Sequence, residues 1–195
     1  MSTNKLKGIG TLLLLWVGLA SSPVAMATTV SIEPATNTFS VNDTFSLDIV
    51  VTDITDLYGF QFDVGFSPSI LSATGITEGA FLPLGGSTFF IPSAIDNVLG
   101  TISFTGDTLL SVPPGVSGSG VLATLSFHAL AAGSSAVELS NIILLDSNLA
   151  DIAFSSQNGT VDVQGGSQVP TPGTLFLLLP GWLGLWLSRR VATRN

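Results

Sequence analysis

Basic side chains are missing from the middle of this 195-residue chain. All five lysines and arginines lie in the two terminal segments, and all thirteen aspartates and glutamates lie between them. Nucleic acids and anionic lipid surfaces are held through lysine and arginine, so neither is a partner of the central region, residues 28–164. Repulsion among its carboxylates has to be relieved by spacing, salt or bound cations.

Three further residue types are scarce. The chain has no cysteine, so it forms no disulfide, and none of its three tryptophans lies in the central region. The lone histidine, His128, falls on the outward side of a predicted strand, and no Gly-x-Ser-x-Gly nucleophile motif occurs. Nothing singles out a catalytic pair among the carboxylates. The chain is therefore predicted not to be an enzyme.

The central region is organised by alternating apolar residues. In the stretch Leu57–Leu71, Phe60, Phe62, Val64 and Phe66 occupy every second position, which places them on one face of a strand. Apolar residues in a similar pattern predict further strands at 29–33, 45–51, 88–91, 102–104, 121–129, 137–145 and 161–163. A turn is predicted at 53–56 and a loop anchored by Phe81 at 79–86. With no helical period here, the fold class is an all-β sandwich.

The first 27 residues read as a secretory signal peptide. Two lysines precede a short apolar run, and Ala25-Met26-Ala27 supplies small residues at the A-x-A spacing. Cleavage is expected after Ala27. The central domain is therefore predicted to be exported.

The last segment combines a linker, an apolar run and a basic end. Residues 165–172 form a Gly/Pro linker that ends in Val169-Pro170-Thr171-Pro172, and residues 173–195 follow as a hydrophobic helix closed by Arg189 and Arg190. The apolar run is shorter than the ~20 residues of a full spanning helix, so on its own it is a marginal membrane anchor with its basic end in the cytoplasm.

This order of segments resembles the PEP-CTERM sorting tail of Gram-negative bacteria. The usual motif is Val-Pro-Glu-Pro, and Thr171 stands at the glutamate position. The resemblance implies transient insertion into the inner membrane, processing by an exosortase-type enzyme, and delivery to the cell surface or extracellular matrix. A retained C-terminal anchor is the alternative.

The central region resembles a cohesin domain. The resemblance rests on the glycine-flanked aromatic strand with Ser-Pro-Ser-Ile-Leu after it, on Gly120–Ala131, and on Val137–Val163. It implies a jelly-roll sandwich of about nine strands that binds calcium-loaded dockerin modules. In cohesins the outward residues of the central strand belong to the docking face. Here that face would include Tyr58, Gly59, Gln61 and Asp63.

Calcium is a second ligand to consider. Asp146, Asn148 and Asp151 offer oxygen ligands within one loop, and Asp53 and Asp56 form another acidic turn. Both segments can equally be ordinary turns, in which aspartate and asparagine bond their own backbone. No other cofactor is predicted.

The sequence predicts an exported, non-catalytic adhesion or scaffolding protein of the cell surface or matrix. The main alternative is a carbohydrate-binding module. A sugar-stacking platform in this region would have no tryptophan, and Tyr58 would be its lone tyrosine.

Overall fold

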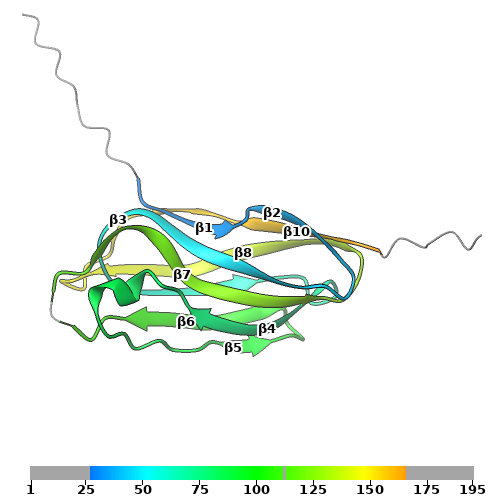
Figure 1. Ribbon diagram of the computed structural model, residues 1–195, viewed down its shortest axis with the longest axis horizontal. Coiled ribbons are helices and arrows are strands. Elements are labelled where there is room, and N and C mark those ends of the chain that lie inside the picture. The colour runs from blue at the N-terminus through cyan, green and yellow to red at the C-terminus, as the bar shows by residue number, and fades with distance from the viewer. Residues whose placement is uncertain (1–26, 112, 166–195) are drawn as a thin grey trace, which may run out of the picture.

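The computed structural model describes residues 27–111 and 113–165. These residues form an all-β sandwich in which long strands run side by side along the long axis (Figure 1). The expected signal peptide up to Met26, the motif Val169–Pro172 and the tail with Arg189 and Arg190 lie outside the described residues. Within 27–111 and 113–165, no helix is long and apolar enough to span a bilayer.

Ten strands and one short 3-10 helix follow one another along the described chain. They are β1 (Thr29–Glu33), β2 (Thr36–Ser40), β3 (Thr44–Gly65), β4 (Leu71–Glu78), η1 (Leu82–Gly85), β5 (Ala94–Asp96), β6 (Thr101–Thr108), β7 (Val116–Ala129), β8 (Gly133–Asp146), β9 (Ser155–Gln157) and β10 (Gly159–Gln164).

The strand β3 belongs to both layers of the sandwich. Its first half pairs with β1 and β7, and its second half pairs with β6 and β8. We call the layer β9–β1–β3–β7–β4 sheet I and the layer β5–β6–β3–β8–β10–β2 sheet II. Because one strand passes through both layers, the two sheets are joined without a loop.

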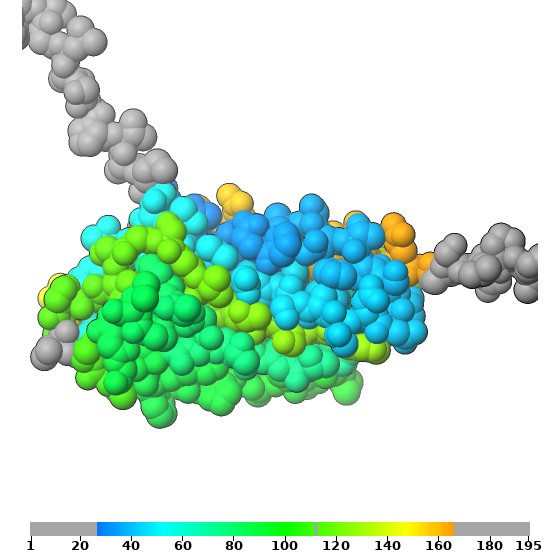
Figure 2. All heavy atoms as spheres, viewed as in Figure 1, coloured from blue at the N-terminus to red at the C-terminus, as the bar shows by residue number. Residues whose placement is uncertain are grey.

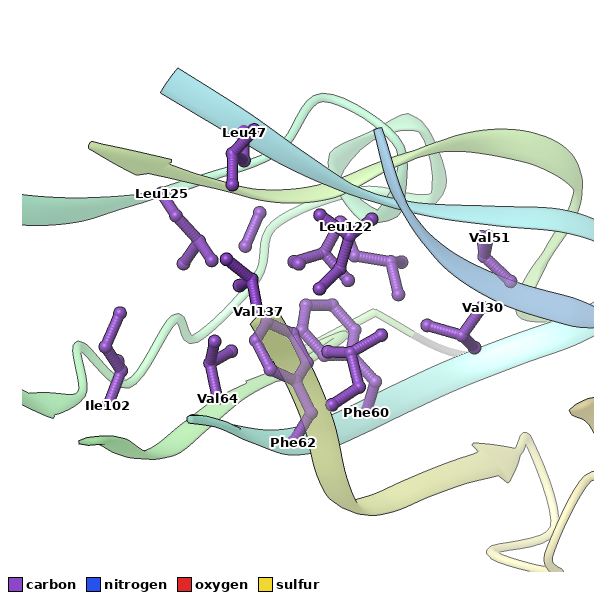
Figure 3. Close-up of a cluster of buried hydrophobic side chains, with 14 of the residues drawn as sticks. Val30, Leu47, Val51, Phe60, Phe62, Val64, Ile102, Leu122, Leu125 and Val137 are labelled. Carbon is purple, nitrogen blue, oxygen red and sulfur yellow. The ribbon is translucent and has the colours of Figure 1, made fainter. Parts of the chain in front are cut away.

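The core lies between the two sheets and is almost entirely apolar. Phe60 and Phe62 stack with ring centroids 5.9 Å apart and are surrounded by side chains from both layers, including Leu122 and Leu125 of β7 and Val137 of β8 (Figure 3). Each buried side chain of this size contributes about 1.5–3 kcal/mol. The predicted inward alternation of the central strand is confirmed.

The predicted turn at 53–56 is wrong. The chain stays extended there, and Asp53 and Asp56 adopt φ values of 55° and 60° as bulge residues within β3. The two side-chain hydroxyls of Ser119 and Ser117 accept hydrogen bonds from the backbone N–H groups of these aspartates, each at 2.9 Å. The bulges let the strand bend from sheet I into sheet II.

Four observed strands are absent from the sequence prediction: β2, β4, β5 and β9. All four are edge strands, and β2, β5 and β9 are short. The strand predicted at 88–91 is wrong, because Thr88 and Ile91 form only isolated β-bridges with Leu109 and Gly106. The predicted anchor Phe81 is buried next to η1, and Ser67 ends the central strand by accepting hydrogen bonds from the backbone of Ile70 and Leu71.

Candidate functional site

A shallow hollow of about 230 Å³ lies on the outward face of sheet II. It extends over the second half of β3 and the neighbouring parts of β6 and β8. The residues that shape it are Tyr58, Gly59, Gln61, Phe104, Gly106, Ile143 and Leu149. We call this surface the sheet II hollow.

Two glycines form the floor of the sheet II hollow. Gly59 of β3 and Gly106 of β6 face outward from adjacent strands, where Gln61 pairs with Gly106 and Gly59 with Thr108. A Cβ at Gly106 would lie 3.4 Å from the carbonyl oxygen of Phe60 and 3.9 Å from Cδ1 of Ile91, so a side chain there would meet ordinary contacts and no clash. The sheet thus lacks side chains where a ligand could approach the backbone closely.

Exposed apolar side chains form the rim. Phe104 is 54% exposed, Ile143 41% and Leu149 68%. Phe104 comes from β6, Ile143 from β8, and Leu149 from the loop that follows β8. Apolar side chains that gather around a hollow are characteristic of an interaction site or a ligand-binding groove rather than of scattered surface residues.

Bulges in both neighbouring strands create this rim. The pairing of β6 with β3 shifts between Phe62 and Val64, and the pairing of β8 with β3 shifts between Gln61 and Asp63. At these points Phe104 has φ 60° and Asn141 has φ 49°. A bulky side chain in the left-handed region is rare, and such strain concentrates at functional sites.

The carboxylate of Asp63 fastens both bulges. Its Oδ1 accepts a hydrogen bond from the backbone N–H of Phe104, and its Oδ2 accepts one from Nδ2 of Asn141, both at 2.6 Å. Asp63 therefore lies on the outward face of the central strand, as expected, but its two oxygens are engaged within the domain. Its place in the site is to shape the rim.

The structure brings the other predicted face residues together. Gly59, Gln61 and Tyr58 all line the sheet II hollow. The ring of Tyr58 is half-buried, and its hydroxyl donates a hydrogen bond to the carbonyl oxygen of Ser111 at 2.7 Å. The tyrosine is thus held in place rather than free to form a sugar-stacking platform.

The sequence analysis missed Phe104, Ile143 and Leu149. Strict alternation from Ile102 predicts an inward Phe104, and only the bulge turns it outward. For Ile143 a signal existed. Four consecutive apolar residues, Ile142 to Leu145, cannot all face one side of a strand.

The loop with the expected calcium ligands has the geometry of an ordinary turn. Asp146 Oδ1 accepts hydrogen bonds from the backbone N–H groups of Asn148, at 2.8 Å, and Ala150, at 2.9 Å. Asp151 forms a β-bridge with Leu145 at the base of the loop. The part of the chain described here contains no group of three or more His, Cys, Asp or Glu side chains arranged around a common metal position.

The second acidic segment is also engaged internally. Asp56 accepts hydrogen bonds from the hydroxyl of Ser147 at 2.6 Å and from the backbone N–H of Gly115 at 2.6 Å. These bonds favour the ionised form, so they lower the pKa of Asp56 below its usual value. Asp56 thus ties β3 to two loops at the end of the sandwich.

The described residues form a two-layer β-sandwich with an apolar hollow on one outer face. Residues 28–163 match the cohesin domain family, and the chain belongs to that family. Cohesin domains are non-catalytic scaffolding modules, which confirms the prediction that the domain is not an enzyme. No curated protein matches the sequence at a significant level.

Several solved cohesins have a similar fold. A non-cellulosomal cohesin of the archaeon Archaeoglobus fulgidus superposes with a TM-score of 0.60 at 14% identity, covering 73% of this chain and 95% of the other. The cohesin CaCohA2 of Clostridium acetobutylicum has a TM-score of 0.57 at 22% identity, covering 72% and 92%. A type I cohesin of Clostridium thermocellum, solved in complex with a dockerin, has a TM-score of 0.58 at 11% identity, covering 71% and 100%. At these identities the likeness concerns the fold.

Proposed function

We propose that the sheet II hollow binds a dockerin-like module of another protein and that the chain acts as an adhesion or scaffolding protein. Cohesin domains mediate protein–protein interactions with dockerins in scaffolds. The observation that carries the proposal is the apolar rim of Phe104, Ile143 and Leu149 around a floor without side chains. A rim and floor of this kind can accommodate the apolar face of a helix.

The acidic surface of the domain restricts the charge that a binding partner can carry. The described part of the chain contains no lysine or arginine, so its surface repels acidic proteins on every side. At the hollow itself the available polar group is the amide of Gln61, because Asp63 is engaged with Phe104 and Asn141. The expected partner therefore has an apolar centre and a basic periphery, which increases its association rate at low salt.

A glycine-to-leucine substitution in the floor gives a direct test. Gly106→Leu would fill the hollow from a position where a side chain meets no backbone clash. The matched control is Gly75→Leu, in β4 of sheet I, where a Cβ has nothing within 4 Å. Calorimetry would use the full chain and calcium-loaded dockerin modules from the same organism. We expect binding by the wild type and the control, and at least about a tenfold loss in Gly106→Leu.

Two results would contradict the docking proposal. One is that no dockerin module binds the wild type, and the other is that Gly106→Leu binds as tightly as Gly75→Leu. A glycan array in parallel tests the alternative of a carbohydrate-binding module. Specific sugar binding that is lost in Gly106→Leu would assign the same hollow to polysaccharide.

We further propose that the protein is exported and sorted by exosortase to the surface of a Gram-negative cell. The proposal is supported by the sequence of the two termini and by the family, since cohesins are typically extracellular or cell-surface scaffolding modules. Mass spectrometry of surface material should find an N-terminus at Thr28 and a C-terminus close to Pro170–Gly173. A surface protein that still ends at Asn195 would contradict sorting by cleavage and favour a retained anchor.

A further inference from the structure

One buried carboxylate inside the sandwich lacks a partner. Asp107 of β6 pairs with Phe60 of β3 and points inward with it, and its side chain is only 4% exposed. Its Oδ1 accepts a hydrogen bond from the backbone N–H of Thr108 at 2.8 Å. Its Oδ2 is the one buried side-chain polar atom without a hydrogen-bond partner among residues 27–111 and 113–165.

The neighbour of this oxygen is a second carboxylate. The carboxylate of Glu78, at the end of β4, is near enough to disfavour ionisation of Asp107. Burial and this neighbour raise the pKa of Asp107 to about 7. Since the described chain has no lysine or arginine, no ammonium or guanidinium of the domain can compensate the pair. A buried carboxylate beside a second carboxylate is costly unless a proton or a cation lies between them.

The surroundings consist of oxygen donors. The hydroxyl of Thr88 contacts Oε1 of Glu78 through a hydrogen bond. Glu78 is solvent-exposed, whereas Asp107 is buried. Carboxylates, a hydroxyl and water are ligands that calcium prefers, and their flexible arrangement suits calcium better than the octahedral demand of magnesium. Nitrogen or sulfur ligands, which zinc and copper favour, are absent from this group of residues.

We propose that Glu78 and Asp107, assisted by Thr88, bind a calcium ion at the edge where sheet I and sheet II meet. The orphaned Oδ2 of Asp107 is the observation that points to a ligand. The proposal does not depend on the docking function, because it rests on the buried carboxyl of Asp107 and its neighbour Glu78, whereas docking rests on the exposed rim of the hollow, which Asp107 also borders.

The position of the pair gives the ion a structural consequence. β4 is the edge strand of sheet I, and Thr88 lies in the segment that bridges to Leu109 just after β6 at the edge of sheet II. These strands lie along the same side of the molecule, where residues from about 71 to 108 form the lower surface in Figures 1 and 2. Further along this side, Asn97 already links the sheets through two hydrogen bonds with the backbone of Ala73, at 2.8 Å and 3.0 Å. Calcium would add a second link.

Thermal unfolding of the full chain without a dockerin partner tests the proposal. At about pH 8 both carboxylates are ionised, since that pH is above the pKa of Asp107. We expect calcium to raise the Tm of the wild type by about 5 °C or more over EDTA at a concentration about 100-fold above its Kd. Magnesium and potassium at the same ionic strength should give much smaller shifts.

The variants identify the ligands. Asp107→Asn and Glu78→Gln should each abolish the calcium shift, and Asp107→Asn should unfold no lower than the wild type in EDTA at about pH 8 because the repulsion is gone. The matched control is Asp162→Asn, an exposed acid on β10, which should keep the full shift. Asp146→Asn tests the loop after β8, where the sequence predicts calcium ligands. It should also keep the calcium-induced shift in Tm. Equilibrium dialysis with radioactive calcium should give one ion per wild-type chain and none for Glu78→Gln, a variant at an exposed position.

Three results would overturn the proposal. The first is a wild type that loses stability from about pH 5 to 8 and is not rescued by calcium, which would show that a shared proton alone satisfies the pair. The second is a calcium shift that survives in both Asp107→Asn and Glu78→Gln. The third is a shift that disappears in Asp146→Asn instead, which would place the ion in the loop after β8.

Discussion

The two halves of β3 share one strand but face different neighbours. The first half pairs with β1 and β7, and its outward positions carry polar residues such as Ser46 and Asp48. The second half pairs with the bulged strands β6 and β8, and its outward face forms the floor of the sheet II hollow. The inward faces of the two halves are alike, because both supply fully buried apolar side chains.

The inward faces of both halves of β3 hold the fold together, whereas the outward face of the second half is available for binding. In the first half, pairing with β1 keeps one register, and the shift against β7 between Ile49 and Val50 leaves the outward positions of Ser46 and Asp48 polar. In the second half, two bulges turn Phe104 outward and shift the partner residues relative to β3. Bulges commonly redirect side chains beside functional sites. The half of β3 that lies beside the outward-turned Phe104 is therefore the half that carries the proposed docking surface.

The largest expected loss of stability comes from substitutions of buried residues in the two halves of β3. They test whether the inward faces of the two halves belong to one core. Phe62→Ala should destabilise the domain by about 3–5 kcal/mol and Leu47→Ala by about 2–5 kcal/mol, since both side chains are fully buried and leave cavities. Urea unfolding of each variant measures the change. A cost below about 1 kcal/mol for Phe62→Ala would mean that the second half is not part of the same core.

A smaller loss of stability is expected when a hydrogen-bonding aspartate is removed from the outward face of either half. Asp63→Ala removes the acceptor of two hydrogen bonds that hold the bulges, and we expect a loss of about 1–2 kcal/mol. Asp48→Ala removes one bond, accepted from the hydroxyl of Thr124 at 2.6 Å, and should cost about 0.5–1 kcal/mol. Hydrogen exchange should show faster opening near Phe104 and Asn141 only in Asp63→Ala. Equal costs with no local opening would mean that Asp63 does not fasten the bulges.

The same contrast explains how far the sequence predicts the structure. Alternation predicts the inward residues of both halves correctly, because burial of one face determines the register of a strand. The bulges escape prediction because their geometry depends on distant partners. Asp63 bonds the backbone of Phe104, 41 residues away, and the side chain of Asn141, 78 residues away. The family resemblance places Tyr58, Gly59 and Gln61 on one face, and they line the hollow, whereas the outward position of Phe104 depends on a bulge that no local pattern indicates.

The junction of the two halves should respond to pH. Hydrogen bonds from the Ser147 hydroxyl and the Gly115 backbone lower the pKa of Asp56 in the folded protein, so its stabilisation is present above about pH 4 and is lost as the pH falls through the folded pKa. Asp56→Asn should therefore lower the urea midpoint at about pH 7 and leave it nearly unchanged at about pH 2. Asp162→Asn serves as the charge control. An equal loss for Asp56→Asn at both pH values would mean that packing, rather than the ionised carboxylate, stabilises the junction.

The smallest change in stability is expected for a substitution of Phe104 at the rim of the hollow. The same substitution should remove most of the dockerin binding. Phe104→Asn replaces a bulky residue at φ 60° by one that tolerates this conformation, and the relief of about 1 kcal/mol offsets the modest packing energy of a half-exposed ring. The Tm should therefore stay within about 3 °C of the wild type while dockerin binding weakens. Phe89→Asn makes the same change at a 58% exposed residue without a positive φ, so it has no such relief and should be less stable than Phe104→Asn. If the two variants lose the same stability, Phe104 is not strained. If Phe104→Asn binds like the wild type, the ring does not contribute to docking, and the difference between the two halves of β3 is one of geometry alone.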